Sequence, residues 1–267
     1  MERVLATMRE RYAEPLSLAE LAAEAFFSPY HFNRVFRYTT GVPPGRFLAA
    51  LRMQQAKHLL ITTDLHVTNV CFEVGYVSLG TFTTHFRQLV GVGPLRLRRL
   101  THALGDVPLE SLCRDGPDAL GDAATAKLLL RAQPDDARAG VVFAGFFRTP
   151  LPQSRPAACT VAALPATPTI ACADRGPHYM LVSAYERSAD VRAALLAGDD
   201  EVLVGVAGPL LLGKPKETTE VRVPLRQLDV VDPPILLALP LVLAEQAEAA
   251  KPRRAGRARA QARVGAR

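Results

Sequence analysis

Residues 17–41 read SLAELAAEAFFSPYHFNRVFRYTTG, and residues 67–91 read VTNVCFEVGYVSLGTFTTHFRQLVG. Each stretch holds a short helix with apolar periodicity, a turn, and a second helix that opens on Ser and carries two Phe residues four positions apart. A basic residue follows the second Phe directly, and a Gly closes each stretch. Two helices joined by a tight turn form a helix-turn-helix, whose second helix is free to lie in a groove. Two such units on one chain predict two groove contacts without a dimer.

Helical periodicity continues from Glu2 to about Leu100 and predicts seven helices, over residues 2–12, 17–25, 28–39, 44–61, 66–74, 78–90 and 94–101. Ser17 with Glu20 forms a capping box, and Pro29 after Ser28 suits a first helical position. Gly residues mark the ends of the helices within the repeat. Gly75 supplies a left-handed residue for the second turn. The first unit has Ala, Phe and Phe at 25–27, so we expect its turn to differ.

The second half of the chain changes period. Residues 102–139 are rich in Asp, Gly and Ala and are expected to be a linker with one helix near 123–132. Short β-type runs follow, over 141–147, 159–164, 169–173, 179–184, 202–207, 220–223 and 226–230, with an inserted helix at 189–197. Regularly spaced short strands predict a sandwich-like β domain over 140–248, closed by an apolar segment at 235–248. Residues 249–267 are expected to be a basic, disordered tail.

Charge is distributed unevenly along the chain. Residues 1–101 carry 12 Lys and Arg against 7 Asp and Glu, a balance of +5. Residues 102–245 carry 13 against 18, a balance of −5, and residues 246–267 carry 7 against 1, a balance of +6. The basic first and last parts can approach a polyanion, whereas the acidic middle would be repelled by one.

The composition limits several classes of function. We expect a cytoplasmic protein, because the sequence shows neither a signal-peptide core nor an apolar run that could cross a bilayer. The four cysteines lack metal-ligand spacing and are expected to be reduced thiols, with a Cys159–Cys172 redox pair as the alternative. We expect no metal and no cofactor. His178 and Tyr179 have no nucleophile beside them, so the sequence does not predict an enzyme.

Residues 1–101 resemble the DNA-binding domain of the AraC/XylS family of bacterial transcription regulators. The resemblance rests on LSLAELAAEAFFSPYHFNRVFRYTTGVPPGRFLAALRMQQAKHLL and VTNVCFEVGYVSLGTFTTHFRQLVGVGPLRLRR, which include both units and the helix between them. It implies a sequence-specific regulator that binds double-stranded DNA. The connecting helix would be about 27 Å long. Because this is near the ~34 Å repeat of B-DNA, two recognition helices could enter adjacent major grooves.

The first recognition helix offers polar groups for reading bases. Its inward stripe is Phe32, Val35 and Phe36. Tyr30, Asn33 and Arg34 then face outward, at positions that the family resemblance assigns to base contacts. Asn can form two hydrogen bonds with adenine and Arg with guanine. Arg37 is expected to contact a phosphate.

The second recognition helix offers fewer side chains that can form strong hydrogen bonds with bases. The residues expected toward DNA are Leu79, Gly80, Thr81, Thr83, Thr84 and Arg87. Thr and Leu side chains can pack on thymine methyl groups, so this unit should add methyl and backbone contacts while the first unit provides most of the specificity. Arg96, Arg98 and Arg99 are expected to meet phosphates. Arg46 and Arg52 fit phosphate contact and ordinary solvation equally well.

Partners beyond DNA are less defined. The resemblance leaves RNA polymerase and a small-molecule effector as candidate partners, and either a monomer or a homodimer as the assembly. The strand pattern after residue 140 resembles small prealbumin-like sandwiches, and Phe143, Phe146, Phe147, Tyr179 and Tyr185 form either its core or an effector pocket. Two alternative functions remain: an architectural DNA-binding protein that uses the tail, and a DNA alkyl-transfer repair protein, which would need an activated Cys.

Overall fold

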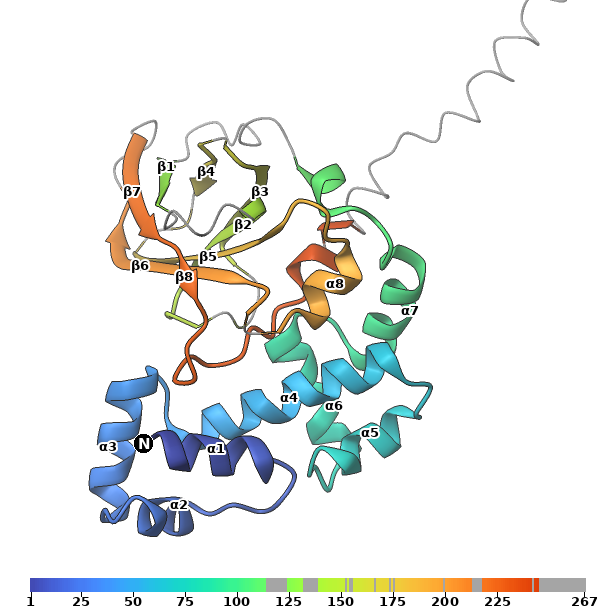
Figure 1. Cartoon of the computed structure of the whole chain (residues 1–267), viewed down its shortest axis with the longest axis vertical. Helices are drawn as coiled ribbons and strands as arrows, with labels where there is room; N and C mark the ends of the chain where they lie inside the picture. The colour runs from blue at the N-terminus through green and yellow to red at the C-terminus, as the bar shows by residue number, and fades with distance from the viewer. Residues whose placement is uncertain are drawn as a thin grey trace, which may run out of the picture.

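The computed structural model describes residues 1–113, 124–131, 139–151, 153, 156–165, 167–172, 174, 176–198, 200–212, 218–241 and 243–244 of the 267-residue chain. A helical part and a β part lie against each other, with the long helix α4 crossing the helical part (Figure 1). The expected tail at 249–267 lies outside the described residues.

Seven helices build the first part, as the sequence predicts. They are α1 (Glu2–Glu10), α2 (Leu18–Glu24), α3 (Pro29–Thr40), α4 (Pro44–Thr62), α5 (Val67–Glu73), α6 (Leu79–Val90) and α7 (Pro94–Leu104). The capping box of Ser17 and Glu20 is present at the start of α2, and Pro29 is the first residue of α3. Gly41 and Gly91 close α3 and α6 in the left-handed conformation (φ 75° and 89°), which costs Gly little because it has no Cβ.

Both turns hold a left-handed residue, although the first has no Gly there; they differ in length, since the first spans residues 25–28 and the second residues 74–78. Phe26 takes the left-handed conformation itself (φ 58°), as Gly75 does in the second unit (φ 80°). Both turns also share one hydrogen-bond pattern: Phe26 N–H donates to the carbonyl of Ala23, as Gly75 N–H donates to that of Phe72. The sequence could not show this, because a non-Gly residue rarely adopts this conformation.

Each unit has its own apolar core. In the first unit, Phe32 and Phe36 of α3 are fully buried against residues of α1, α2 and α4. In the second unit, Phe82 and Phe86 of α6 are equally buried. The helix α4 contributes to both cores, since Phe47 packs into the first and Met53 into the second. The helix between the units is therefore part of both.

The stretch expected to be a linker is structured where it is described. A short 3₁₀ helix, η1 (Leu109–Leu112), follows α7 and buries both of its leucines. Residues 124–131 form the strand β1 (Ala124–Arg131), so the helix expected near 123–132 is wrong. Ala, Lys and Leu favour helices locally, but pairing with two neighbouring strands overrides that weak preference.

Two sheets pack face to face in the second part, which confirms the predicted sandwich. The three-stranded sheet has the order β4-β1-β7 and the five-stranded sheet β3-β2-β5-β6-β8. The strands are β2 (Ala139–Phe147), β3 (Ala158–Ala163), β4 (Thr169–Cys172), β5 (Pro177–Glu186), β6 (Leu203–Leu211), β7 (Thr218–Pro224) and β8 (Arg226–Gln227). Pairing is antiparallel except between β1 and β7. The prealbumin-like resemblance stays a prediction.

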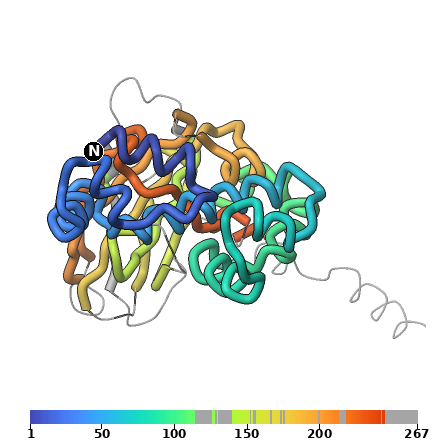
Figure 2. Tube along the Cα trace, turned by 90° about the horizontal axis from the view of Figure 1, so that it is seen from below, coloured from blue at the N-terminus to red at the C-terminus, as the bar shows by residue number. Residues whose placement is uncertain are grey.

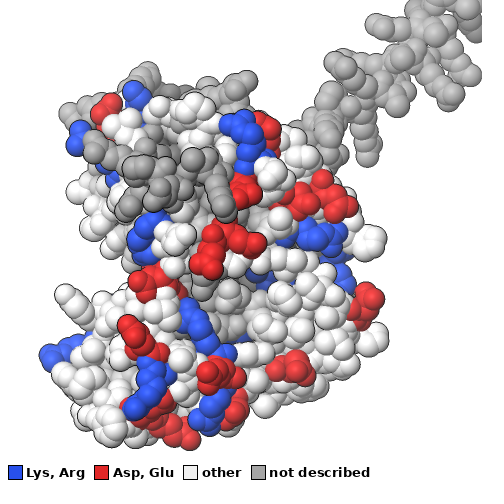
Figure 3. All heavy atoms as spheres, in the orientation of Figure 1, with Lys and Arg blue, Asp and Glu red and all other residues white. Residues whose placement is uncertain are grey.

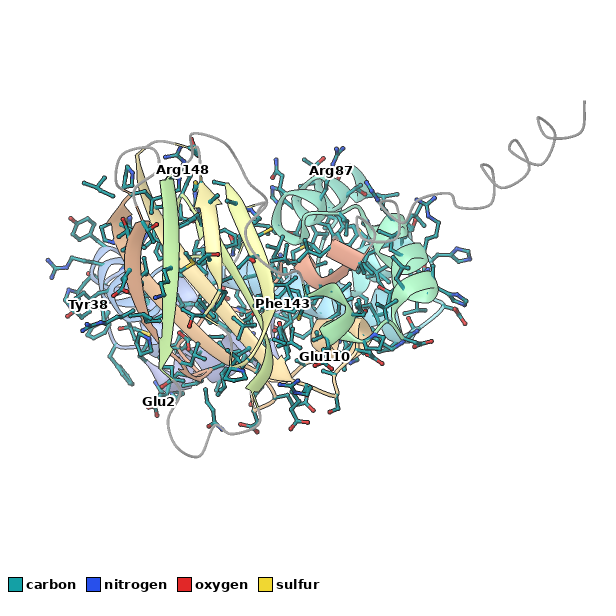
Figure 4. The ribbon with its side chains drawn as sticks, turned by 90° about the horizontal axis from the view of Figure 1, so that it is seen from above. Glu2, Tyr38, Arg87, Glu110, Phe143 and Arg148 are labelled. Atoms are coloured by element: carbon teal, nitrogen blue, oxygen red, sulfur yellow. The ribbon has the colours of Figure 1, made fainter. Side chains whose placement is uncertain are left out.

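Alternate residues of β2 face two different cores. Val142, Ala144 and Phe146 point between the sheets, while Val141 and Phe143 point away from them, as the period of a strand requires. The outward residues join one continuous apolar core with α6, α7, the short helix α8 (Val191–Leu196) and the C-terminal residues Leu236 and Leu241. Phe143 lies where the strands meet the helices (Figure 4). The second unit and the sandwich therefore share a core.

The C-terminal apolar segment forms much of this junction. Residues 233–241, which we call the C-terminal strap, run between the two parts, and the expected burial of this segment is confirmed for its described residues. The strap crosses beside α4 in the view from below (Figure 2). Its Ala238 N–H donates to the carbonyl of Val90, the last residue of α6 (3.0 Å). The strap thus ties the sandwich to the second unit.

Candidate nucleic-acid interface

The first recognition helix, α3, is fixed by its two ends and by its apolar stripe. The Ser28 hydroxyl accepts a hydrogen bond from His31 N–H (3.4 Å), and Gly41 ends the helix. With Phe32 and Phe36 buried, Tyr30 is left 82% exposed, and Arg34 and Arg37 are exposed as well. These exposures hold with the sandwich in place. The outward face of α3 is therefore free to meet a partner.

Asn33 and Arg34 lie at the middle of this face. Asn33 is half-buried rather than fully exposed. One guanidinium nitrogen of Arg34 lies 3.4 Å from His31 Nδ1, and the His31 ring meets Phe27 edge-on at 4.7 Å. This row of contacts holds Arg34 beside the N-terminal end of α3. It reduces the side-chain freedom that the arginine would lose on binding.

The second recognition helix, α6, repeats this design. The Ser78 hydroxyl accepts from Thr81 N–H (3.4 Å), and Phe82 and Phe86 are buried. The predicted outward residues Leu79, Gly80, Thr81, Thr83, Thr84 and Arg87 are all exposed. Tyr38 of α3 and Arg87 of α6 both project from the surface of the molecule (Figure 4).

Arg52 clamps the two units to each other. Its guanidinium donates to the carbonyls of Tyr12 and Glu14 (2.7 Å each), in the loop between α1 and α2, and lies 5.8 Å from the centre of the Tyr76 ring in the second turn. Burial lowers the pKa of Arg52. Of the two roles left open for Arg52, the structure supports neither, because its donors face the protein.

Gly75 lies against the same loop. A Cβ at this position would lie 2.2 Å from the carbonyl oxygen of Ala13, a distance that real Cβ atoms do not reach. The Tyr12–Glu14 loop, Arg52 and the second turn form what we call the inter-unit clamp. Together with α4, whose 19 residues span about 28 Å, the clamp fixes the relative placement of α3 and α6.

Arg98 also has a structural role, which corrects its expected phosphate contact. Its guanidinium donates to the carbonyls of Leu60, Thr63 and Leu65 (3.1, 3.2 and 2.6 Å). These carbonyls lie at and beyond the end of α4, where the last backbone carbonyls of a helix have no N–H donor within the helix. Arg46, Arg96 and Arg99 are exposed. The spacing of arginines in the sequence cannot distinguish one that holds helix-end carbonyls from one that faces solvent, since only the fold shows which arginine lies beside the unpaired carbonyls.

Two residues were missed by sequence reasoning. Tyr38, 92% exposed on α3, lies four positions after Arg34 and so on the same helix face. The helical period alone could have found it. Lys57 of α4 is buried at 6% exposure, which no pattern around it indicated.

Surface charge and the state of the cysteines bear on the kinds of partner and reaction that the chain can support. On the face shown in Figure 3, positive and negative side chains are interleaved over the helical part. Burial raises the pKa of the Cys71 and Cys172 thiols, and none of the four cysteines, all of which lie in the described part of the chain, forms a disulfide. The described residues hold no cluster of three or more metal-ligating side chains, and the helices they form include none with the length and hydropathy to span a membrane.

His178 is buried in the sandwich rather than placed in a catalytic set. Its side chain is fully buried, with Nε2 3.4 Å from the Asp174 carboxylate, which also pairs with Arg148 at 2.6 Å. The ring meets Phe146 edge-on. This arrangement fits the expected structural role of the histidine.

A family model described as a helix-turn-helix domain matches residues 21–100. The transcriptional activator RhaS of Escherichia fergusonii is 30% identical over 99 residues, which are 37% of this chain and 36% of RhaS. The bifunctional transcriptional activator and DNA repair enzyme AdaA of Bacillus subtilis is 29% identical over 34% of this chain and 44% of AdaA. The transcriptional activator AarP of Providencia stuartii is 27% identical over 35% of this chain and 70% of AarP.

Solved structures match a similar share of the chain. The DNA-binding domain of the global transcriptional factor AdpA, in complex with a target DNA, is 35% identical and covers 38% of this chain and 91% of that one, with a TM-score of 0.37. The C-terminal domain of the response regulator yesN from Fusobacterium nucleatum is 26% identical, with coverages of 36% and 95% and a TM-score of 0.35. The chain spans about a third of the length of RhaS, and the sandwich lies outside the residues that the family model matches.

Proposed function

The helical part of this chain is a helix-turn-helix domain of the AraC/XylS type, and from this premise we propose that the chain is a transcriptional regulator that reads two adjacent major grooves. The observation that carries the proposal is the pair of recognition helices on one rigid frame. Their outward residues stay exposed while α4 and the inter-unit clamp fix their separation. The length of α4 between the two units, about 28 Å, is near the ~34 Å repeat of the duplex.

The two units would read DNA by different chemistry. Tyr30, Asn33 and Arg34 offer paired hydrogen bonds to base edges, each pair worth roughly 1–3 kcal/mol of discrimination. Leu79, Thr83 and Thr84 offer methyl contacts and hydroxyl groups, whose selectivity is smaller. We therefore assign most of the specificity to the first unit. Arg37 and Arg87, each at the rim of its helix, are assigned to phosphates, which set register rather than sequence.

The sandwich would sense an effector or join two copies of the chain. Its shared core with the second unit supports either role, because residues of the sandwich and of α6 pack in one cluster and a change in the sandwich would alter the packing around α6. Contact with RNA polymerase, a cytoplasmic location and the absence of enzyme activity belong to the same proposal. Raised thiol pKa values at Cys71 and Cys172 give no support to the alkyl-transfer alternative.

Selection of bound sequences from a random DNA pool tests the proposal directly. The full-length chain should select an asymmetric site of about two helical turns, and its affinity should fall steeply with salt. A specific-to-nonspecific affinity ratio near one would instead favour the architectural alternative.

Two alanine variants then test the division of roles. Arg34→Ala should lose discrimination at one or two base pairs of the selected site, by roughly 1–3 kcal/mol each, whereas Thr84→Ala should cost less. Arg37→Ala is the matched control, because loss of a phosphate contact weakens binding to all sequences alike. If Thr84→Ala costs more specificity than Arg34→Ala, the assignment is wrong.

A further inference from the structure

A single lysine is buried where the helical part meets the sandwich. Lys57 of α4 is 6% exposed, and its Nζ donates to the carbonyl of Ile235 in the C-terminal strap (3.0 Å). Desolvation lowers its pKa to about 8, and no acidic group acts against that shift. In the part of the chain that the structure describes, no carboxylate lies within ion-pair distance of Nζ. An ammonium buried without a counter-charge is costly to the fold.

A cavity of about 290 Å³ adjoins this lysine. It lies between α4, the end of α8 and the C-terminal strap, and we call it the junction cavity. Its polar lining is Gln54, Gln55, Lys57 and His58 from α4, together with Tyr185 from β5. Its apolar lining includes Leu195, Leu228 and Leu237. For comparison, a cavity of about 150 Å³ already holds a benzene ring.

The two sides of the junction cavity suit a molecule with a charged end and an apolar body. We propose that the junction cavity binds a small organic carboxylate, with its carboxylate paired to Lys57 and its apolar body against Leu195, Leu228 and Leu237. The ligand would supply the counter-charge that the described residues of the protein do not. The amide groups of Gln54 and Gln55 are donors and acceptors for further polar groups on the ligand. An inorganic anion would neutralise Lys57 but leave the leucines uncovered.

The position of the cavity would connect such a ligand to DNA binding. Ile235, which accepts from Lys57, lies three residues before Ala238, whose N–H holds the end of α6. A carboxylate that draws the Lys57 ammonium away from Ile235 would loosen one anchor of the C-terminal strap and so change the support of the second recognition helix. This coupling rests on the proposed regulatory function, whereas binding itself does not.

Thermal unfolding and calorimetry of the full-length chain test the site without DNA. The probes are benzoate and hexanoate, their uncharged amides benzamide and hexanamide, and inorganic phosphate. At least one of the two carboxylates should raise the melting temperature at millimolar concentration, and its amide should not. If neither carboxylate binds, or if phosphate binds as tightly as both, the proposal is overturned.

Two lysine variants place the binding on Lys57. Lys57→Met keeps the length of the side chain and removes its charge, so it should weaken carboxylate binding roughly tenfold or more. Lys127→Met, at a half-exposed lysine of β1 that lies 3.8 Å from Glu220, should leave binding unchanged. If Lys57→Met folds and binds the carboxylate as the parent chain does, the proposal fails.

Measurements with DNA separate this inference from the proposed function. A carboxylate that binds through Lys57 and shifts DNA affinity supports both the site and its coupling. Binding through Lys57 with unchanged DNA affinity supports the site and overturns the coupling. If the chain proves unable to select DNA, the proposed function fails while the ligand site stands or falls on the calorimetry alone.

Discussion

Replacing Gly75 with Ala should damage the inter-unit clamp far more than an ordinary glycine substitution. The left-handed conformation (φ 80°) alone costs a non-Gly residue about 1–2 kcal/mol. The new Cβ would also lie 2.2 Å from the Ala13 carbonyl oxygen, so that loop would have to withdraw by about 1 Å. The neighbouring carbonyls of Tyr12 and Glu14 hold Arg52, and losing one such charged hydrogen bond costs about 1.5–3 kcal/mol.

The expected total for Gly75→Ala is about 3–5 kcal/mol of unfolding free energy. Gly41→Ala is the matched control, because Gly41 has nearly the same φ (75°) but no atom within 4 Å of a new Cβ, so only the conformational cost of about 1–2 kcal/mol applies. Urea unfolding of the two variants in the full-length chain measures the difference. Equal losses of stability would refute the close contact between Gly75 and the Ala13 loop.

Three further predictions concern single side chains. Phe26→Gly should be about 1 kcal/mol more stable than Phe26→Ala in urea unfolding, because both lose the contact with Arg3 and only Ala keeps the left-handed strain. Arg98→Met should lower the unfolding free energy by about 2 kcal/mol and leave the salt dependence of DNA binding unchanged. Arg99→Ala should reduce the slope of log affinity against log salt concentration by about 1. A reduced slope for Arg98→Met would contradict the structural role of Arg98. Because the folded pKa of Lys57 is about 8 and the unfolded value 10.5, the unfolded state holds the extra proton between these values, and stability should rise with pH there by about 3 kcal/mol. Lys57→Met should flatten that rise, and a rise of the same size in this variant would assign it to another group.

The helices of residues 1–104 could be predicted from sequence to within three residues at each end, because their signals are local. Ser caps, the Phe pair four residues apart and the closing Gly each determine structure within one or two helical turns. The exposed faces of α3 and α6 follow from the same period. What could not be predicted depends on contacts between distant segments. Arg52 and Arg98 have the same local appearance as exposed arginines, and their carbonyl partners lie 33–40 residues away.

The β half shows the same limit more strongly. Each expected strand was found, but the strand expected at 226–230 is only β8 (Arg226–Gln227), the strand expected at 202–207 extends to Leu211, and β1 was expected to be a helix. Its sequence favours a helix locally, and only its neighbours β4 and β7 make it a strand. The expected division into a helical domain, a linker and a β domain likewise did not predict the shared core. The apolar residues of α6 and of the C-terminal strap that meet there are separated by about 150 residues of chain.

The shared core has a practical consequence for anyone building hybrid proteins from this chain. A splice after residue 101 would strip α6 of Leu236 and Leu241 and leave Phe143 and Tyr185 without their helical neighbours. Joining the helical part to a different domain would therefore expose apolar surface on both fragments. The core of the first unit contains mainly Leu151 from the sandwich, so this unit would lose fewer apolar contacts on separation than the second unit.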